Sequence, residues 1–313
     1  MPGSILFQLH ELFFRGALTI GEDWGGPDCA AYTPFSIHVQ ESVAWILILL
    51  SIGRQLHFQK TIDALYVKAS EHFKGVKRRS SLQRVFEVSV ASLYFSMFAT
   101  LLLIKVKTQA MVNLLQPCHI FLLMQGAALL FSSSPMGILL HLLMLPPQTG
   151  VLFAIGMPAI NGLSDIEIYI FWIQHYLLAT MPFYLFIRNN FAATKLCSFS
   201  LLFIGIWAFA LLHFTVYEVL AVSFHVNPQF MLCPTYGMRD LFALFPSYMM
   251  FPSYRTFTTV LFMILAIIQS YLYFGAAQLI HYFKNLMFPE ASTVTDGDLC
   301  GDGNGNTGEK MKK

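Results

Sequence analysis

Residues 85–104, VFEVSVASLYFSMFATLLLI, carry a single charged side chain, Glu87. A helix of about 20 such residues crosses the roughly 30 Å hydrocarbon core of a bilayer. Six further stretches have the same character, at approximately 37–53, 112–132, 136–156, 166–187, 200–222 and 257–280. We therefore predict an all-α, polytopic membrane protein with about seven transmembrane helices.

The composition of the whole chain supports this class. Hydrophobic residues make up 56% of the 313 residues and charged residues 12%, whereas soluble domains average about 25% charged. The mean hydropathy is +0.60. A water-facing surface cannot absorb such a deficit of charge, because each apolar side chain left in water forfeits about 1.5 to 3 kcal/mol. A soluble enzyme, a disordered chain, a nucleic-acid binder and a disulfide-stapled secreted module are excluded.

The distribution of basic residues predicts the orientation, since short cytoplasmic loops retain Lys and Arg. Alternating the seven spans places 14 of the 19 basic residues on the side of the loop 54–84 and five on the other side. We therefore expect a lumenal or extracellular N-terminal segment at 1–36 and a transmembrane domain at 37–284. The Gly- and Asp-rich residues 285–313 are expected to form a disordered cytoplasmic tail.

Two predicted spans contain prolines that interrupt a helix. In the fourth, Pro146 and Pro147 break the backbone hydrogen bonds midway, which a bilayer tolerates only where protein or a wet cavity covers the break. We expect two half-helices that line an interior. In the third, Pro117 frees the carbonyl of residue 113 and favours a kink next to Cys118.

The five cysteines contain no CxxC pair, so neither a zinc ribbon nor a thioredoxin motif is predicted. Cys29 and Cys233 lie in polar connections that the topology places on one side of the membrane. The sequence alone leaves open whether they form a disulfide.

Ionisable and polar groups at membrane depth are functional hypotheses. The candidates are Gln116-Pro117-Cys118-His119 in the third span, His141 in the fourth, Gln174-His175 in the fifth and His213 in the sixth. At 1.5 Å per residue, Cys118, His175 and His213 share a layer in the outer half of the membrane. A thiol with an imidazole is the smallest set for acyl transfer, because the imidazole takes the thiol proton.

The geometry of a helix selects the partner of the cysteine. His119 is about 100° around the helix from Cys118, so the base is expected from another span, with His175 first and His213 second. The alternatives are a cysteine that only fills space and histidines that make interhelical hydrogen bonds. Three histidines could hold zinc, but no HxxxH or HExxH spacing supports it. We expect no metal and no cofactor.

The motifs resemble those of the transmembrane protein 164 family. The resemblance rests on LLQPCHIFLLMQ around Cys118, GGPDCAA at 25–31, IEIYIFWIQHYLL at 166–178 and HVNPQFMLCP at 225–234, in the same order along the chain. It implies a membrane acyltransferase of phospholipid remodelling, with Cys118 as acyl carrier and His175 as its partner. The implied donor is a phosphatidylcholine-like lipid and the implied acceptor an ether-linked lysophosphatidylethanolamine, with a polyunsaturated acyl chain and a link to ferroptosis.

The sequence-based hypothesis is a ping-pong transfer in which His175 serves both half-reactions. Supporting residues, as orienting groups or oxyanion donors, are His119, Asn161, His213 and Asn227. The chemistry of lipid remodelling favours the endoplasmic reticulum. The alternatives are a lipid-ester hydrolase, or a seven-helix lipid transporter or receptor without catalysis.

Overall fold

The computed structural model describes residues 5–19, 24–74, 80–188, 199–235, 238–240, 244 and 254–287. The described residues are helical apart from turns and one isolated bridge between Gly25 and Val226. The helices are α1 Ile5–His10, η1 Glu11–Arg15, η2 Ala17–Thr19, α2 Pro27–Ala30, α3 Phe35–Gln55, α4 Phe58–Lys74, α5 Ser81–Lys107, η4 Met111–Leu115, α6 Pro117–Leu130, α7 Pro135–Met144, α8 Thr149–Gly156, α9 Asp165–Arg188, α10 Phe199–Leu212, η6 His213–Tyr217, α11 Glu218–Phe224, η7 Pro228–Phe230 and α13 Tyr254–Met287.

The all-helical membrane class is confirmed. Five helices are long and apolar enough to cross a bilayer: α3, α5, α9, the continuous stretch Ser200–Phe224, and α13. The pair α7 and α8 adds a sixth span if its two halves are counted together. The chain is therefore a multi-pass integral membrane protein.

The third predicted span, 112–132, is shorter than expected. Its residues form the 3₁₀ turn η4 and then α6, a helix of 14 residues that begins at Pro117. Proline is favoured at the first position of a helix because its missing N–H has no intrahelical acceptor there. Pro117 thus starts a helix, where we had expected a kink inside one.

The fourth predicted span is broken, as the two prolines indicated. Helices α7 and α8 meet at an angle of 47°, and the turn between them holds Pro146 and Pro147. The hydroxyl of Thr149 donates to the freed Pro146 carbonyl at 2.9 Å. In the same turn, Gln148 donates to the buried Gln125 at 3.1 Å. The freed backbone carbonyl is therefore satisfied within the protein, whereas Gln148 Oε1 and Gln125 Nε2 are buried without a hydrogen-bond partner among the described residues.

Helix α5 begins earlier than its predicted span, because Ser80 caps it. The Ser80 hydroxyl accepts from the Gln83 N–H, and the Gln83 side chain accepts from the Ser80 N–H, both at 3.2 Å. This reciprocal capping box satisfies two donors at the helix start.

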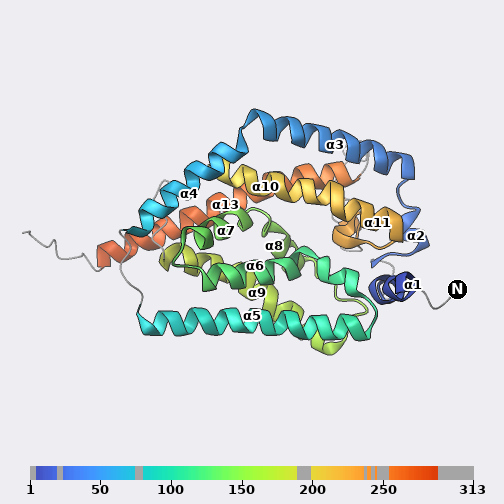
Figure 1. The fold of residues 1–313 in the computed structure, drawn as a ribbon, viewed down its shortest axis with the longest axis horizontal. Coiled ribbons are helices and arrows are strands. Elements are labelled where there is room, and N and C mark those ends of the chain that lie inside the picture. Colours follow the sequence, from blue (N-terminus) through green and yellow to red (C-terminus); the bar gives the residue numbers. More distant parts are fainter. Residues whose placement is uncertain are drawn as a thin grey trace, which may run out of the picture.

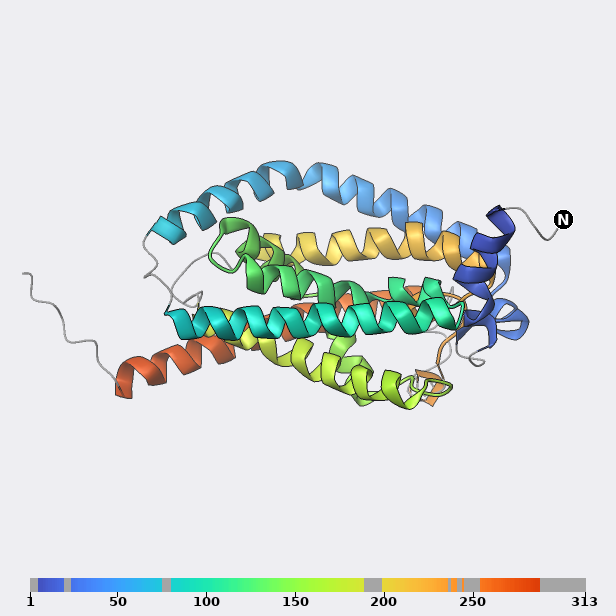
Figure 2. The same ribbon diagram turned by 60° about the horizontal axis from the view of Figure 1, so that its bottom comes forward.

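The helices run along the long axis of the molecule, and α3 with α4 forms a bent arm along one edge (Figure 1). Helices α1, α2 and α11 gather at one end, and α4 reaches toward the other (Figures 1 and 2). A Cys29–Cys233 disulfide joins α2 to the segment after α11. This answers the question that the sequence left open and ties the N-terminal segment to the 225–235 loop.

The polar tail predicted from residue 285 lies outside the described residues, except that 285–287 still belong to α13.

Gly205 of α10 tests the close contact between α10 and α7, and Gly275 of α13 serves as its control. A Cβ at Gly205 would lie 2.4 Å from the Leu143 carbonyl oxygen of α7, whereas a Cβ at Gly275 of α13 would meet nothing within 4 Å. We expect Gly205→Ala to destabilise the protein by about 1 to 3 kcal/mol through overpacking. Gly275→Ala should be neutral or stabilising by up to about 1 kcal/mol, because alanine favours helix. Thermal unfolding in detergent measures both; equal melting temperatures for the two variants would contradict the close contact.

Candidate active site

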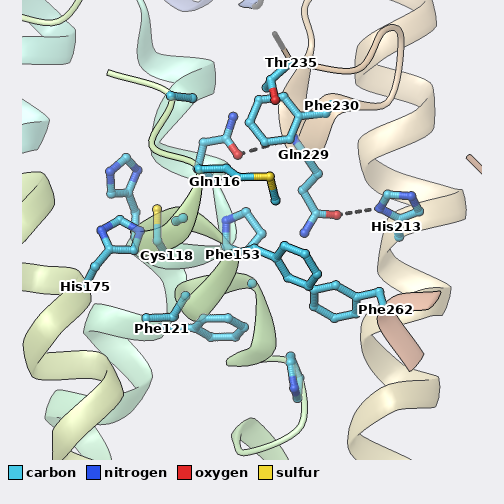
Figure 3. Close-up of a pocket in the computed structure, with 18 of the residues that line it drawn as sticks. Gln116, Cys118, Phe121, Phe153, His175, His213, Gln229, Phe230, Thr235 and Phe262 are labelled. Atoms are coloured by element: carbon cyan, nitrogen blue, oxygen red, sulfur yellow. Dashed lines mark hydrogen bonds between the residues drawn. The ribbon is translucent and has the colours of Figure 1, made fainter. Parts of the chain in front are cut away.

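A cavity of about 280 Å³ lies between α5, α6, α8 and α9 on one side and α10 and α13 on the other. Its lining is mainly apolar. Figure 3 shows Cys118 and His175 on one side of it and His213 on the opposite side. The structure thus brings the three residues selected by depth into one cavity.

Cys118 occupies the first turn of α6. The N–H groups of a first turn lack intrahelical acceptors and carry a partial positive charge, which stabilises an anion. The backbone N–H groups of Cys118 and His119 face the thiol, and the Gln174 side chain contacts it. A thiolate formed here would be stabilised by these dipoles.

The tautomer of His175 follows from one contact. Its Nδ1 lies 2.6 Å from the carbonyl oxygen of Phe171. A carbonyl only accepts, so Nδ1 carries a proton, and in the neutral ring Nε2 then carries the lone pair. Among the described residues, Nε2 of His175 has no hydrogen-bond partner. His175 is therefore oriented as a neutral base.

No hydrogen bond joins Cys118 to His175 in the described structure. Catalytic hydrogen bonds are often long before substrate binds and tighten in the complex. The two side chains lie on packed helices, α6 and α9, and line the same cavity. The thiol and the imidazole therefore face one cavity from neighbouring helices.

His119 of α6 makes the same kind of contact to the backbone as His175 of α9. Its Nδ1 lies 2.8 Å from the Asn113 carbonyl oxygen, which also accepts the Gln116 N–H at 3.2 Å at the end of η4. The imidazole lines the cavity and is close enough to His175 to interact electrostatically. His119 thus faces the site despite its angle from Cys118.

The other supporting residues differ in placement. His213 lines the cavity, and its Nδ1 lies 2.6 Å from Gln229 Oε1. Asn227 lies outside the cavity lining; its side chain bonds the backbone of Leu232 and Cys233. Asn161 is exposed on a turn, where its carbonyl accepts from the Trp24 indole. Asn227 and Asn161 therefore support the surrounding loops.

Two further amide side chains lie near the thiol. The sequence named Gln116 among the polar candidates but gave it no role, and it did not name the Asn113 side chain. Gln116 and Asn113 line the cavity, and their side-chain nitrogens are buried without a hydrogen-bond partner. Gln116 Oε1 accepts from the Gln229 N–H at 3.3 Å, which leaves its Nε2 as a free donor. Its position directly before Pro117-Cys118 was the one available signal.

Buried charges were also missed. Lys105 of α5 and Glu167 of α9 form an ion pair at 2.5 Å on the cavity wall. Lys105 lies within electrostatic range of Cys118. Arg255 bonds Glu218 at 2.7 Å and pairs with Glu41 at 3.4 Å. These charged residues lie at or near the ends of predicted spans. The sequence therefore places them near the membrane–water interface and gives no indication of which residues pair.

No group of three or more His, Cys, Asp or Glu side chains in the described ranges is arranged to hold a metal ion.

Fold and site together define a multi-pass helical membrane protein with a thiol and neutral imidazoles around an apolar cavity. The chain belongs to the TMEM164 family, whose family model matches residues 35–273. This confirms the family resemblance of the motifs. No solved structure matches the chain.

The Lys105–Glu167 pair gives a stability prediction. Lys105→Met leaves the Glu167 carboxylate buried without its cation, which costs about 3 to 5 kcal/mol. The double variant Lys105→Met/Glu167→Gln should recover most of that loss, because no unpaired charge is left. Thermal unfolding of the three proteins in detergent measures it. A double variant no more stable than Lys105→Met would contradict a direct pairing.

Proposed function

We propose that the protein is a membrane acyltransferase that carries an acyl chain on Cys118 as a thioester. One observation carries the proposal: a thiol in the first turn of a helix shares an apolar cavity with His175, whose free Nε2 is positioned as a base. A transporter or receptor has no need of a buried nucleophile next to a base.

The first half-reaction follows from these groups. His175 Nε2 takes the Cys118 proton, and the thiolate attacks the carbonyl carbon of a donor ester. The carbonyl electron pair moves to oxygen and returns as the C–O bond to the lysophospholipid breaks. That leaving oxygen takes the proton from His175, and the acyl chain stays on sulfur.

In the second half-reaction the hydroxyl of an acceptor lysolipid attacks the thioester. A base takes the hydroxyl proton, the new ester leaves, and the proton returns to the Cys118 sulfur. Water in place of the lysolipid would make the same site a hydrolase.

The family membership supports the substrate assignment: a polyunsaturated chain moves from a phosphatidylcholine-like donor to an ether lysophosphatidylethanolamine. Such products feed lipid peroxidation and ferroptosis, and remodelling of this kind favours the endoplasmic reticulum. The mainly apolar lining suits an acyl chain.

We also propose seven membrane segments, counting η4 with α6, with a lumenal N-terminus. The Cys29–Cys233 disulfide supports this orientation, because disulfides persist in oxidising compartments such as the lumen.

The activity test compares wild type, Cys118→Ala and His175→Ala at matched abundance in membranes. Acyl transfer from labelled phosphatidylcholine to ether lysophosphatidylethanolamine should fall at least about 100-fold in both variants, the scale of a lost base. His141→Ala is the control, since this buried histidine of α7 lies outside the cavity lining. It should retain transfer within about threefold of wild type.

Two results would contradict the proposed acyltransferase. Unchanged transfer in Cys118→Ala would remove the catalytic assignment and favour a lipid transporter or receptor. Lipid release that does not depend on added lysolipid would indicate a hydrolase.

A further inference from the structure

The two imidazoles next to the thiol make the same kind of contact to the backbone. His119 and His175 each have Nδ1 within hydrogen-bond distance of a backbone carbonyl, at 2.8 and 2.6 Å. A carbonyl oxygen only accepts, so both rings carry a proton on Nδ1, and in the neutral form each has its lone pair on Nε2. Neither Nε2 has a hydrogen-bond partner among the described residues, and both rings line the cavity.

The cavity wall beside the thiol holds one more imidazole base than the thiol requires. One base is enough to deprotonate Cys118. His119 is 9% exposed and His175 1%. A second free Nε2 in the same cavity therefore indicates a second proton transfer.

The two rings have different surroundings. His175 lies against the Phe171 ring, with centroids 4.1 Å apart, and its neighbour Gln174 contacts the thiol. His119 interacts electrostatically with both members of the Lys105–Glu167 ion pair and is bonded to Asn113. The polar headgroup of a lysolipid fits this charged wall of the cavity, and its hydroxyl would arrive beside His119.

We propose that the two histidines divide the reaction, with His175 as the base for Cys118 and His119 as the base for the acceptor hydroxyl. This rests on the thioester mechanism proposed above. His119 Nε2 takes the hydroxyl proton while the hydroxyl oxygen bonds the acyl carbon. The carbon–sulfur bond breaks, the thiolate leaves, and His119 returns the proton to sulfur. His175 is assigned to the thiol because Gln174, the residue before it, contacts the sulfur. His119 is then left for the second substrate.

The test uses His119→Asn in the full-length protein in membranes. An asparagine amide stands in for Nδ1–H as the donor to the Asn113 carbonyl but supplies no base at the Nε2 position. Labelled phosphatidylcholine is added first, and the hydroxylamine-sensitive label on Cys118 is followed. Ether lysophosphatidylethanolamine is then added, and the decay of that label is timed.

We expect label formation in His119→Asn within about threefold of wild type and decay slower by at least about 100-fold, the range of a lost general base. Label formation is itself the check that the variant folds. His57→Asn is the matched control. His57 is exposed and lies outside the cavity lining, and its Nδ1 likewise lies 2.9 Å from a backbone carbonyl, that of Gln55, so its label should decay at the wild-type rate.

Three outcomes would overturn the division. Decay in His119→Asn at the wild-type rate would show that His175 serves both halves. Loss of label formation in His119→Asn would show that His119 acts before the thioester or only supports the fold. Equal slowing in His57→Asn would show a general effect of the substitution on the protein. Absence of any Cys118-dependent label in wild type would instead reject the proposed function.

Discussion

Inside a bilayer, no water is present to bond a free backbone group, so every interruption of a helix must be satisfied by the protein itself. In the part of the chain that the structure describes, apolar helical segments are interrupted between η4 and α6 and between α7 and α8. Both interruptions lie next to the cavity. At the first, Pro117 starts a helix under Cys118, and the carbonyl of Asn113 becomes the acceptor that fixes the tautomer of His119. The helix interruptions therefore position the residues of the site.

The same constraint explains why the charges lie where they do. Ionised groups in low dielectric must be paired, and the described charges at the helix ends meet across elements: Lys105 with Glu167, and Arg255 with Glu218. Both pairs lie beside the cavity, which lets the wall carry polar groups while the lining stays mainly apolar. Such a cavity suits a lipid, whose headgroup and ester are polar and whose chain is not.

Much of this architecture could be predicted from local sequence. Each of the seven apolar stretches is helical, and the prolines at 146 and 147 break the fourth. Depth arithmetic placed Cys118, His175 and His213 in one layer of the membrane, and in the structure they line one cavity. Tertiary geometry could not be predicted. The role of Pro117 as a helix start, the free amide of Gln116 and the position of His119 depend on where the Asn113 carbonyl and Gln229 lie. Periodicity carries no such information, and Asn161 shows that nearness in sequence to a span does not place a residue in the cavity.

The central claim is that Cys118 carries the acyl chain, and mass spectrometry of the purified protein tests it most directly. Protein in phosphatidylcholine nanodiscs without acceptor would be digested, and the peptide containing Cys118 weighed. We predict a mass increase of one acyl chain on Cys118, removed by hydroxylamine and absent from His175→Ala. An unmodified Cys118 peptide in wild type that transfers acyl chains would contradict the account.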